Sequence, residues 1–259
     1  MKLTLAYSPC PNDTFIFYKM FKDQSYDIHL HDVEKLNILL ENSKYDISKA
    51  SFYKWLSLRD KYELLNVGSA LGNGCGPILI SKSNKTLNRN SKIAVPGRNT
   101  TAYLLFQLCY GNLGEKKFMT YDKVIDSLVN DEVDFAIIIH ESRFVYQSFN
   151  LVEINDLGRW WEEETKLPIP LGCIVANKNL GKEVISQIEH EILNSLSYAY
   201  ENRNEVINYV KIHAQELDEN VMNNHIKTYV NSYTENLGVK GKRSIDVLLK
   251  KAIEQGIVQ

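Results

Sequence analysis

Short apolar runs of strand length alternate with amphipathic segments of helical length along this sequence. We expect strands at residues 3–7, 26–32, 46–51, 78–81, 92–97, 118–121, 135–139 and 171–176. Helices are expected between these runs, because apolar residues there recur at intervals of three and four. Such an alternation of strands and helices is typical of an α/β protein.

The expected strands fall into two groups, one ending near residue 80 and one spanning residues 93–139. The C-terminal part of the chain shows only helical spacing. This order suggests two α/β lobes, the second inserted into the first. Residues 1–90 and 173–259 would form the first lobe and residues 91–172 the second. A cleft between two such lobes is a natural place to enclose a small ligand.

Composition excludes several classes of function. The chain has 259 residues, 44% hydrophobic and 24% charged, with a formal net charge of −2. A nucleic-acid surface would need a basic excess, so we expect no nucleic-acid partner. No apolar run has the length of a membrane span, and the first residues do not resemble an export signal. We therefore expect a cytoplasmic protein with no membrane partner that binds a small molecule.

The cysteines do not predict a metal site. The sequence contains four, Cys10, Cys75, Cys109 and Cys173, and no two of them have metal-ligand spacing. Free thiols in a reducing compartment are the expected state. The glycines at positions 72, 74 and 76 match no nucleotide-binding pattern, and a tight turn is their expected role.

The loop at residues 8–15 (SPCPNDTF) joins the first expected strand to the first expected helix. Asn12, Asp13 and Thr14 are residue types that commonly cap helices. Loops at the carboxyl ends of strands bind ligands in open α/β sheets, so this loop should form one wall of a small-molecule site. Cys10 could be a nucleophile, but a packing or substrate-lining role is favoured, because a nucleophilic cysteine usually has a histidine base and the sequence cannot show that His140 reaches it.

His140 is the sharpest catalytic candidate. It follows the most apolar expected strand, and a neutral imidazole can act as a general base near neutral pH. The alternative is a histidine that ends a strand and hydrogen-bonds to a neighbour, and position alone leaves both open. The other histidines are assigned to the surface or to local structure: His29, His31, His190, His213 and His225.

Three hydroxyl residues are candidates for anion binding. Thr100 and Thr101 precede an expected helix, whose N-terminus favours a carboxylate or phosphate. Simple capping is the better explanation on spacing alone, although the two threonines could divide these roles. Ser51 either faces a cleft or caps the helix expected at residues 52–56, and capping is again favoured.

Several segments together resemble the 1,4-dihydroxy-6-naphthoate synthases, which act in menaquinone biosynthesis by the futalosine route. The segments are residues 8–15, 94–97 (AVPG), 100–103 (TTAY), 138–143 (IIHESR), 157–162 (LGRWWE), 167–172 (LPIPLG), 213–217 (HAQEL) and 228–231 (TYVN). The resemblance implies a two-lobed fold like that of type 2 periplasmic binding proteins. It also implies a cofactor-independent lyase that converts cyclic dehypoxanthine futalosine, a carboxylate, into 1,4-dihydroxy-6-naphthoate.

The resemblance also implies roles for individual residues. His140 matches the family's proton-abstracting histidine. The residues expected to bind substrate are Lys49, Ala50, Ser51, Thr101, Ala102, Cys10, Asn12 and Asp13. The sequence departs from the family pattern at Ala50, where a larger apolar residue such as leucine is expected. It departs again at Asn99, where a histidine is more usual.

Two other functions share the expected fold. A solute-binding protein would need export, would not need a histidine at a strand end, and would return its ligand unchanged. Chorismate dehydratase, the sibling enzyme of the same pathway, has a similar two-lobed fold. The loop at residues 8–15 and the segment at residues 140–143 favour the naphthoate synthase over the dehydratase.

Overall fold

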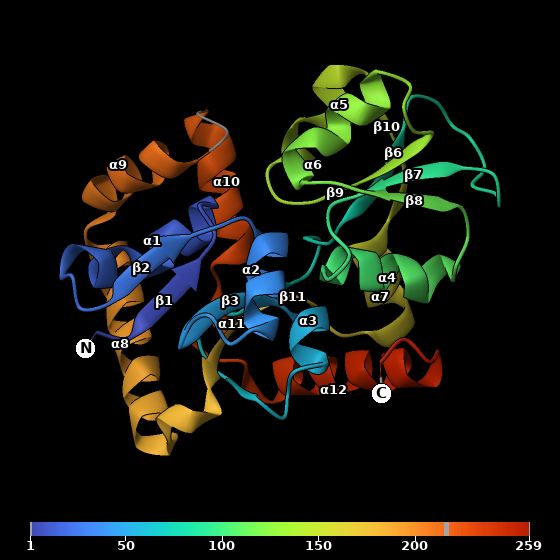
Figure 1. Ribbon diagram of the computed structural model, residues 1–259. Coiled ribbons are helices and arrows are strands. Elements are labelled where there is room, and N and C mark those ends of the chain that lie inside the picture. Colours follow the sequence, from blue (N-terminus) through green and yellow to red (C-terminus); the bar gives the residue numbers. More distant parts are fainter. Residues whose placement is uncertain (1, 215–217, 259) are drawn as a thin grey trace.

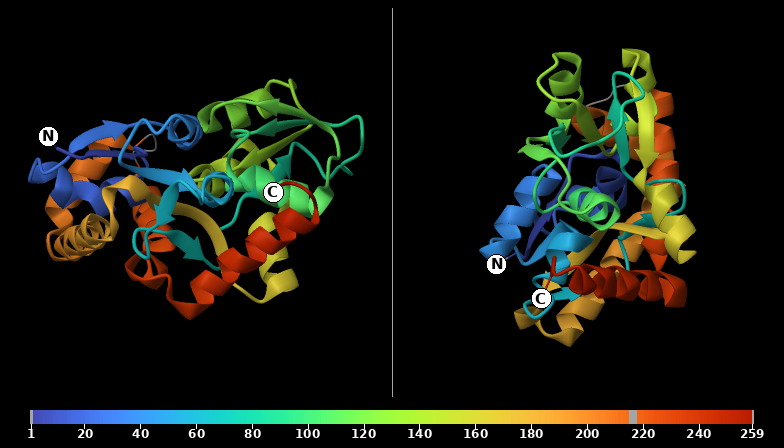
Figure 2. Two further views of the ribbon diagram at one scale, coloured as in Figure 1. Left: turned by 60° about the horizontal axis from the view of Figure 1, so that its bottom comes forward. Right: turned by 90° about the vertical axis from the view of Figure 1, so that its right-hand side faces the viewer.

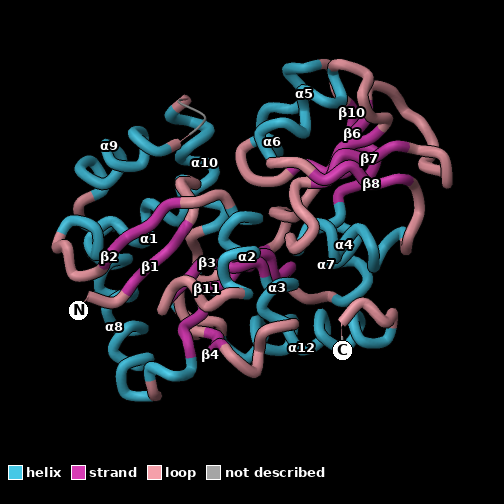
Figure 3. The backbone as a smooth tube through the Cα atoms, viewed as in Figure 1, coloured by secondary structure: helices cyan, strands magenta, loops and turns pink. Residues whose placement is uncertain are grey.

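The chain forms two lobes, and each lobe is built on its own β-sheet (Figure 1). This computed structural model describes residues 2–214 and 218–258. Figure 3 shows the strands of the two sheets as separate groups, with helices around both. The prediction of a two-lobed α/β architecture is therefore confirmed.

The first sheet contains six strands. Its order is β2 (Asp27–Leu30), β1 (Thr4–Tyr7), β3 (Ile47–Ser51), β11 (Ile169–Asn177) and β4 (Tyr62–Leu64), and β5 (Ala70–Gly72) also pairs with β11. Strands β1, β2 and β3 are parallel, whereas β11 is antiparallel to each of its neighbours. Along β1 the side chains alternate between two cores. Leu5 and Tyr7 pack in the core formed with α1 (Pro11–Lys22), and Ala6 packs against α2 (Val33–Glu41).

The second sheet contains five strands and is covered by helices on both faces. Its order is β10 (Val152–Asp156), β6 (Ile78–Ser81), β9 (Phe135–Ile138), β7 (Lys92–Val95) and β8 (Glu115–Phe118). Along β9, Phe135 and Ile137 face the core shared with α4 (Thr101–Tyr110). Ala136 and Ile138 face the core formed with α5 (Val124–Val129). Burial on both faces explains why β9 is apolar without alternation.

The remaining helices complete the two lobes. They are α3 (Phe52–Leu56), η1 (Tyr121–Lys123), α6 (Ser142–Val145), η2 (Tyr146–Phe149), α7 (Leu157–Thr165), η3 (Lys178–Leu180), α8 (Lys182–Glu201), α9 (Arg203–His213), α10 (Glu219–Tyr229), α11 (Ser232–Glu235) and α12 (Gly238–Glu254). Helices α8, α9 and α10 pack around α1. Helix α12 packs against β11 and α4 and so extends from the first lobe to the second (Figure 2). None of the helices within residues 2–214 and 218–258 has the length and hydrophobicity that crossing a bilayer requires.

The predicted lobe boundaries differ from the observed sheets. Residues 78–81, expected in the first lobe, pair with β9 and β10 in the second sheet. Residues 169–172, expected in the second lobe, already belong to β11 of the first sheet. The chain thus crosses between the sheets after Gly72 and returns between Asp156 and Ile169. An apolar run shows that a strand exists, but its pairing partner lies far away in the sequence.

Some predicted elements were also misplaced. The strand expected at residues 118–121 is β8, which ends at Phe118, and strands β4, β5 and β10 were not predicted. Helix α1 begins at Pro11 with Cys10 at the N-cap position, so Asn12 and Asp13 lie in its first turn and do not cap it. Proline suits the first helical position, because its missing N–H would have no helical partner there.

The two crossings touch each other through glycines. A Cβ atom on Gly76 would lie 2.3 Å from the Cα atom of Gly158, and a Cβ atom on Gly158 would lie 2.7 Å from the Cα atom of Gly76. The Leu157 N–H donates a hydrogen bond of 2.9 Å to the Pro77 carbonyl beside this contact. Only residues without a side chain permit so close an approach of two backbones.

We expect Gly158→Ala to lower the free energy of unfolding by about 1–3 kcal/mol, because the new methyl group meets backbone that cannot rotate away. Chemical denaturation would measure the change. Gly241→Ala is the matched control, since a Cβ atom there lies at least 3.3 Å from its nearest neighbours, which are all side chains. Equal stability of the two variants would contradict the importance of the glycine contact.

Candidate functional site

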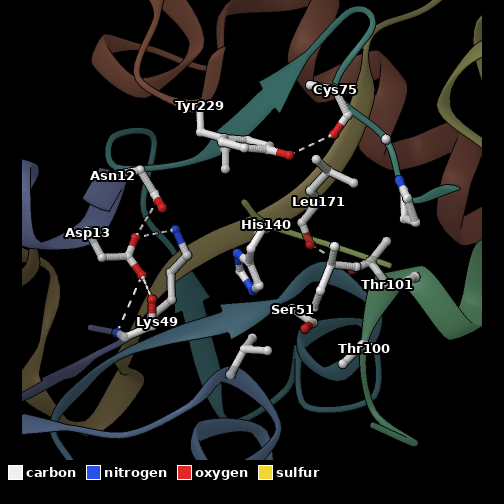
Figure 4. A pocket seen from close by; sticks show the side chains of 18 residues that line it. Asn12, Asp13, Lys49, Ser51, Cys75, Thr100, Thr101, His140, Leu171 and Tyr229 are labelled. Carbon is white, nitrogen blue, oxygen red and sulfur yellow. Dashed lines mark hydrogen bonds and ion pairs between the residues drawn. The ribbon is translucent and has the colours of Figure 1, made fainter. Parts of the chain in front are cut away.

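A cavity opens between the two lobes (Figure 4). It is lined by polar and apolar side chains from both lobes, as sites for small organic ligands are. The loop at residues 8–13 and the end of β3 supply one wall. The start of α4 and the two residues after β9 supply the opposite wall.

A buried ion pair fixes the first wall. Lys49 Nζ lies 2.8 Å from Asp13 Oδ1, and the two side chains are only 7% and 1% exposed. The Asn12 Nδ2 group donates to Asp13 Oδ1 at 2.7 Å, and the Ser8 hydroxyl donates to Asp13 Oδ2 at 2.6 Å. The carboxylate therefore joins β3 to the first turn of α1. The Ser8 N–H also donates to Oδ2 at 3.3 Å, and these four interactions compensate for the loss of water that burial of a charge requires.

Alternation along β3 decides which of its residues reach the cavity. Lys49 and Ser51 line it, whereas Ala50 packs in the core on the other face, together with Cys173. Ser51 is held by Asn37, whose Nδ2 group donates to the serine hydroxyl at 3.0 Å. Ser51 also occupies the N-cap position of α3, but it makes no capping hydrogen bond through its side chain.

The N-terminus of α4 faces the cavity from the second lobe. Thr100 caps the helix, because its hydroxyl accepts a hydrogen bond from the Tyr103 N–H at 3.3 Å. The Thr101 hydroxyl donates to the Leu171 carbonyl at 2.7 Å and accepts from the Tyr53 N–H at 3.2 Å. The first N–H groups of a helix have no partner within it, and the helix dipole favours negative charge there. The predicted capping is confirmed, and this helix end can also receive an anion.

His140 lies two residues beyond β9 and has a positive φ of 57°. Its Nδ1 atom is 3.6 Å from Cys10 Sγ, and its Nε2 atom has no hydrogen-bond partner among the described residues. The residue as a whole is partly exposed, but its Nε2 atom is buried. Burial lowers the pKa of His140 to about 4, with the Asp13 carboxylate partly opposing this effect. The imidazole is therefore neutral near pH 7 and can accept a proton.

A second histidine lies behind His140. His225, assigned to the surface or to local structure by the sequence, is fully buried, and its ring lies parallel to that of His140 at 6.0 Å. Its Nε2 atom is 2.9 Å from Asn12 Oδ1. Because the Asn12 amide nitrogen donates to Asp13, Asn12 Oδ1 must accept, and His225 carries its proton on Nε2. Its Nδ1 lone pair then faces Glu141 Oε2 at 3.6 Å.

Burial lowers the pKa of His225 well below its usual value, with smaller contributions from His140 and Lys49. A signal for this position was present in the sequence. His225 lies three residues after Met222 and four before Tyr229, within a buried stripe of α10 that includes Ile226. A histidine inside an apolar stripe requires a buried partner.

The structure brings most of the predicted site residues together. Those that line the cavity are Asn12, Asp13, Lys49, Ser51, Thr101, Ala102 and His140. Two predicted contacts lie elsewhere: Ala50 faces the core, and Cys10 lies beside His140 without lining the cavity. The lining residues that sequence reasoning did not propose as contacts include Val33, Ala70, Cys75, Leu171 and Tyr229.

We expect Lys49→Met to lower the free energy of unfolding by about 3–5 kcal/mol, because it leaves the buried Asp13 carboxylate without its cation. Adding Asp13→Asn should recover part of this loss. Lys19→Met is the control, since the Lys19–Asp23 pair lies at the surface and contributes about 1 kcal/mol or less. Denaturation midpoints would compare the variants, and an equally small change for Lys49→Met would show that the pair does not support the fold.

Comparison with known proteins places the chain among enzymes of one pathway. A family model described as menaquinone biosynthesis matches residues 3–254. A 1,4-dihydroxy-6-naphthoate synthase of Thermus thermophilus is 38% identical over 260 residues, covering 98% of this chain and 95% of that protein. The synthase of the same name from Streptomyces coelicolor is 36% identical over 266 residues, covering 99% and 94%.

Solved structures with the same architecture confirm the fold class. A protein from Archaeoglobus fulgidus superposes with a TM-score of 0.95 at 32% identity, covering 99% of this chain and 98% of that one. The periplasmic aliphatic sulphonate binding protein of Escherichia coli has a TM-score of 0.66 at 10% identity, covering 99% and 88%. The second likeness shows the fold alone, which is that of the periplasmic binding proteins.

Proposed function

Because the chain belongs to the menaquinone biosynthesis family, we propose that it is a 1,4-dihydroxy-6-naphthoate synthase that acts on cyclic dehypoxanthine futalosine. The reaction would begin with proton abstraction by His140 and proceed by carbon–carbon cleavage. The observation that carries this proposal is the buried Nε2 atom of His140, which lacks a hydrogen-bond partner among the described residues. It lies on the same cavity wall as the start of α4, which can bind a carboxylate.

The substrate carboxylate would bind at the start of α4. The backbone N–H groups of Thr101 and Ala102 lie in the first turn of this helix, and both residues line the cavity. The Ser51 hydroxyl, fixed by Asn37, would donate a further hydrogen bond from the first lobe. A carboxylate held from both lobes would orient the attached ring system toward His140.

His140 would then take a proton from a carbon atom of the bound substrate through Nε2. The imidazole is neutral near pH 7, so it does not need to lose a proton first. The electron pair of the broken C–H bond would drive cleavage of the carbon–carbon bond to the sugar-derived fragment. Formation of the second aromatic ring would supply the driving force. The protonated imidazole could return its proton to the leaving fragment.

The position of the cavity supports a reaction shielded from water. Lys49 and Ser51 come from the first lobe, and Thr101 and His140 come from the second, so the substrate would be enclosed between the two sheets. Enclosure strengthens each polar interaction inside the site and protects reactive intermediates. Separation of the lobes would admit substrate and release products.

Mass analysis of products after incubation with cyclic dehypoxanthine futalosine tests the proposed reaction. A parallel incubation with chorismate tests the sibling dehydratase, whose product would be enolpyruvyl benzoate. Recovery of the futalosine derivative unchanged, after demonstrated binding, would indicate a solute-binding protein.

We expect His140→Ala to lower turnover by a factor of about 10²–10⁴, because general-base catalysis contributes effects of that size. Substrate binding, measured by calorimetry, should remain close to that of the unchanged protein. His190→Gln is the control, since His190 is exposed and hydrogen-bonds to a carbonyl of its own helix. Near-normal turnover by the alanine variant would exclude His140 as the base.

We expect Ser51→Ala to raise KM about 10- to 100-fold with a smaller effect on kcat, because a hydrogen bond to a charged group contributes about 1.5–3 kcal/mol. Steady-state kinetics would separate the two constants. Ser57→Ala, at the exposed end of the following helix α3, is the control. An unchanged KM in the Ser51 variant would show that its hydroxyl does not bind the substrate.

A further inference from the structure

Three side chains with different metal-binding atoms meet beside the cavity. One donor atom each from Cys10, His140 and Glu141 lies within 4.8 Å of the other two. Cys10 and Glu141 are 3% and 7% exposed. Cys10 comes from the loop before α1, whereas His140 and Glu141 follow β9, so the group joins the two lobes. Local spacing in the sequence could not predict it, because 130 residues separate Cys10 from His140.

His225 places a fourth donor next to this group. Its Nδ1 atom lies 3.6 Å from Glu141 Oε2 and has no hydrogen-bond partner among the described residues. The Asn12 amide oxygen accepts from the other ring nitrogen, which fixes the ring and leaves the lone pair on Nδ1. A histidine that ligates a metal usually donates its second N–H to a protein acceptor in this way.

The separations match those of a tetrahedral zinc site. Zinc bonds of about 2.0–2.3 Å place neighbouring ligand atoms roughly 3.4–3.6 Å apart. Two pairs already have this separation: Cys10 Sγ with His140 Nδ1 at 3.6 Å, and Glu141 Oε2 with His225 Nδ1 at 3.6 Å. The donor atoms of Cys10, His140 and Glu141 all lie within 4.8 Å of one another. Rotation of the side chains can therefore bring the two pairs around one ion.

We propose that Cys10, His140, Glu141 and His225 form a site for a zinc-like divalent cation, and that the bound ion inhibits the enzyme. Thiolate and imidazole ligands favour zinc or cobalt over magnesium or calcium. On binding, the thiol of Cys10 releases its proton to solvent. The ion also connects both lobes, so it holds them together.

Inhibition follows from the two nitrogens of His140 and rests on the function proposed above. An ion on Nδ1 leaves the ring proton on Nε2. The proposed base then has no lone pair to accept a proton from the substrate. Zinc and catalysis would therefore exclude one another, although the ion binds beside the substrate cavity and not within the carboxylate subsite.

Titration of the reduced, chelator-treated, full-length protein with cobalt(II) tests the site without any substrate. We expect one cobalt per chain, a thiolate-to-cobalt charge-transfer band in the near ultraviolet, visible bands of four-coordinate cobalt, and loss of all bands when zinc is added. Cys10→Ser should abolish the charge-transfer band, and His225→Gln should weaken cobalt binding at least tenfold. Cys109→Ser is the matched control and should behave like the unchanged protein, because Cys109 contacts Asn155 away from this group.

Circular dichroism of each variant without metal would confirm that it folds. A misfolded Cys10→Ser protein would be replaced by Cys10→Ala, which is smaller and makes no ligand. Absence of a charge-transfer band in the unchanged protein, or its persistence in a folded Cys10 variant, would overturn the site. Cobalt binding together with turnover that zinc does not reduce would overturn the inhibition alone. If the protein did not turn over the proposed substrate, the proposed function would fail, but the cobalt titration would still test the metal site.

Discussion

The buried ion pair between Asp13 and Lys49 is the interaction on which the arrangement of the site depends. It holds the first turn of α1 against the end of β3. The Asp13 carboxylate also orients the Asn12 side chain, because it accepts a hydrogen bond from the Asn12 amide nitrogen. That orientation determines which nitrogen of His225 carries a proton. The Asp13 carboxylate thus determines which groups donate and which accept in this buried hydrogen-bond network, because each group in it has few other hydrogen-bond partners.

Much of the fold could be predicted from local patterns, because strand and helix periodicity reflect which faces are buried. The two-sided burial of β9 and the capping of α4 by Thr100 follow directly from such patterns. His140 was identified because the strand before it is unmistakable and the ends of such strands gather at one edge of a sheet. Lys49, Ala50 and Ser51 were expected to bind substrate from the family resemblance, which could not show that the side chain of Ala50 points to the opposite face of the strand.

The remaining features depend on contacts between residues far apart in the sequence. Strand β6 belongs to the second sheet because it pairs with β9, and no local property of its residues reveals that partner. The approach of Cys10 to His140, and of His225 to Glu141, likewise requires three segments to converge. For this reason the sequence predicted no metal site, although the place of His225 within an apolar stripe of α10 already indicated its burial.

The contact between Gly76 and Gly158 has a mechanical consequence. The two connections meet at this contact, so the chain passes from one lobe to the other and back at the same place. His140 and the start of α4 both belong to the second lobe, so a rotation of one lobe against the other would not change their separation. A ligand docked on α4 would already be aligned with the imidazole, and the other lobe would add its groups afterwards. The spacing between the anion-binding helix end and the imidazole would thus be independent of how far the two lobes open.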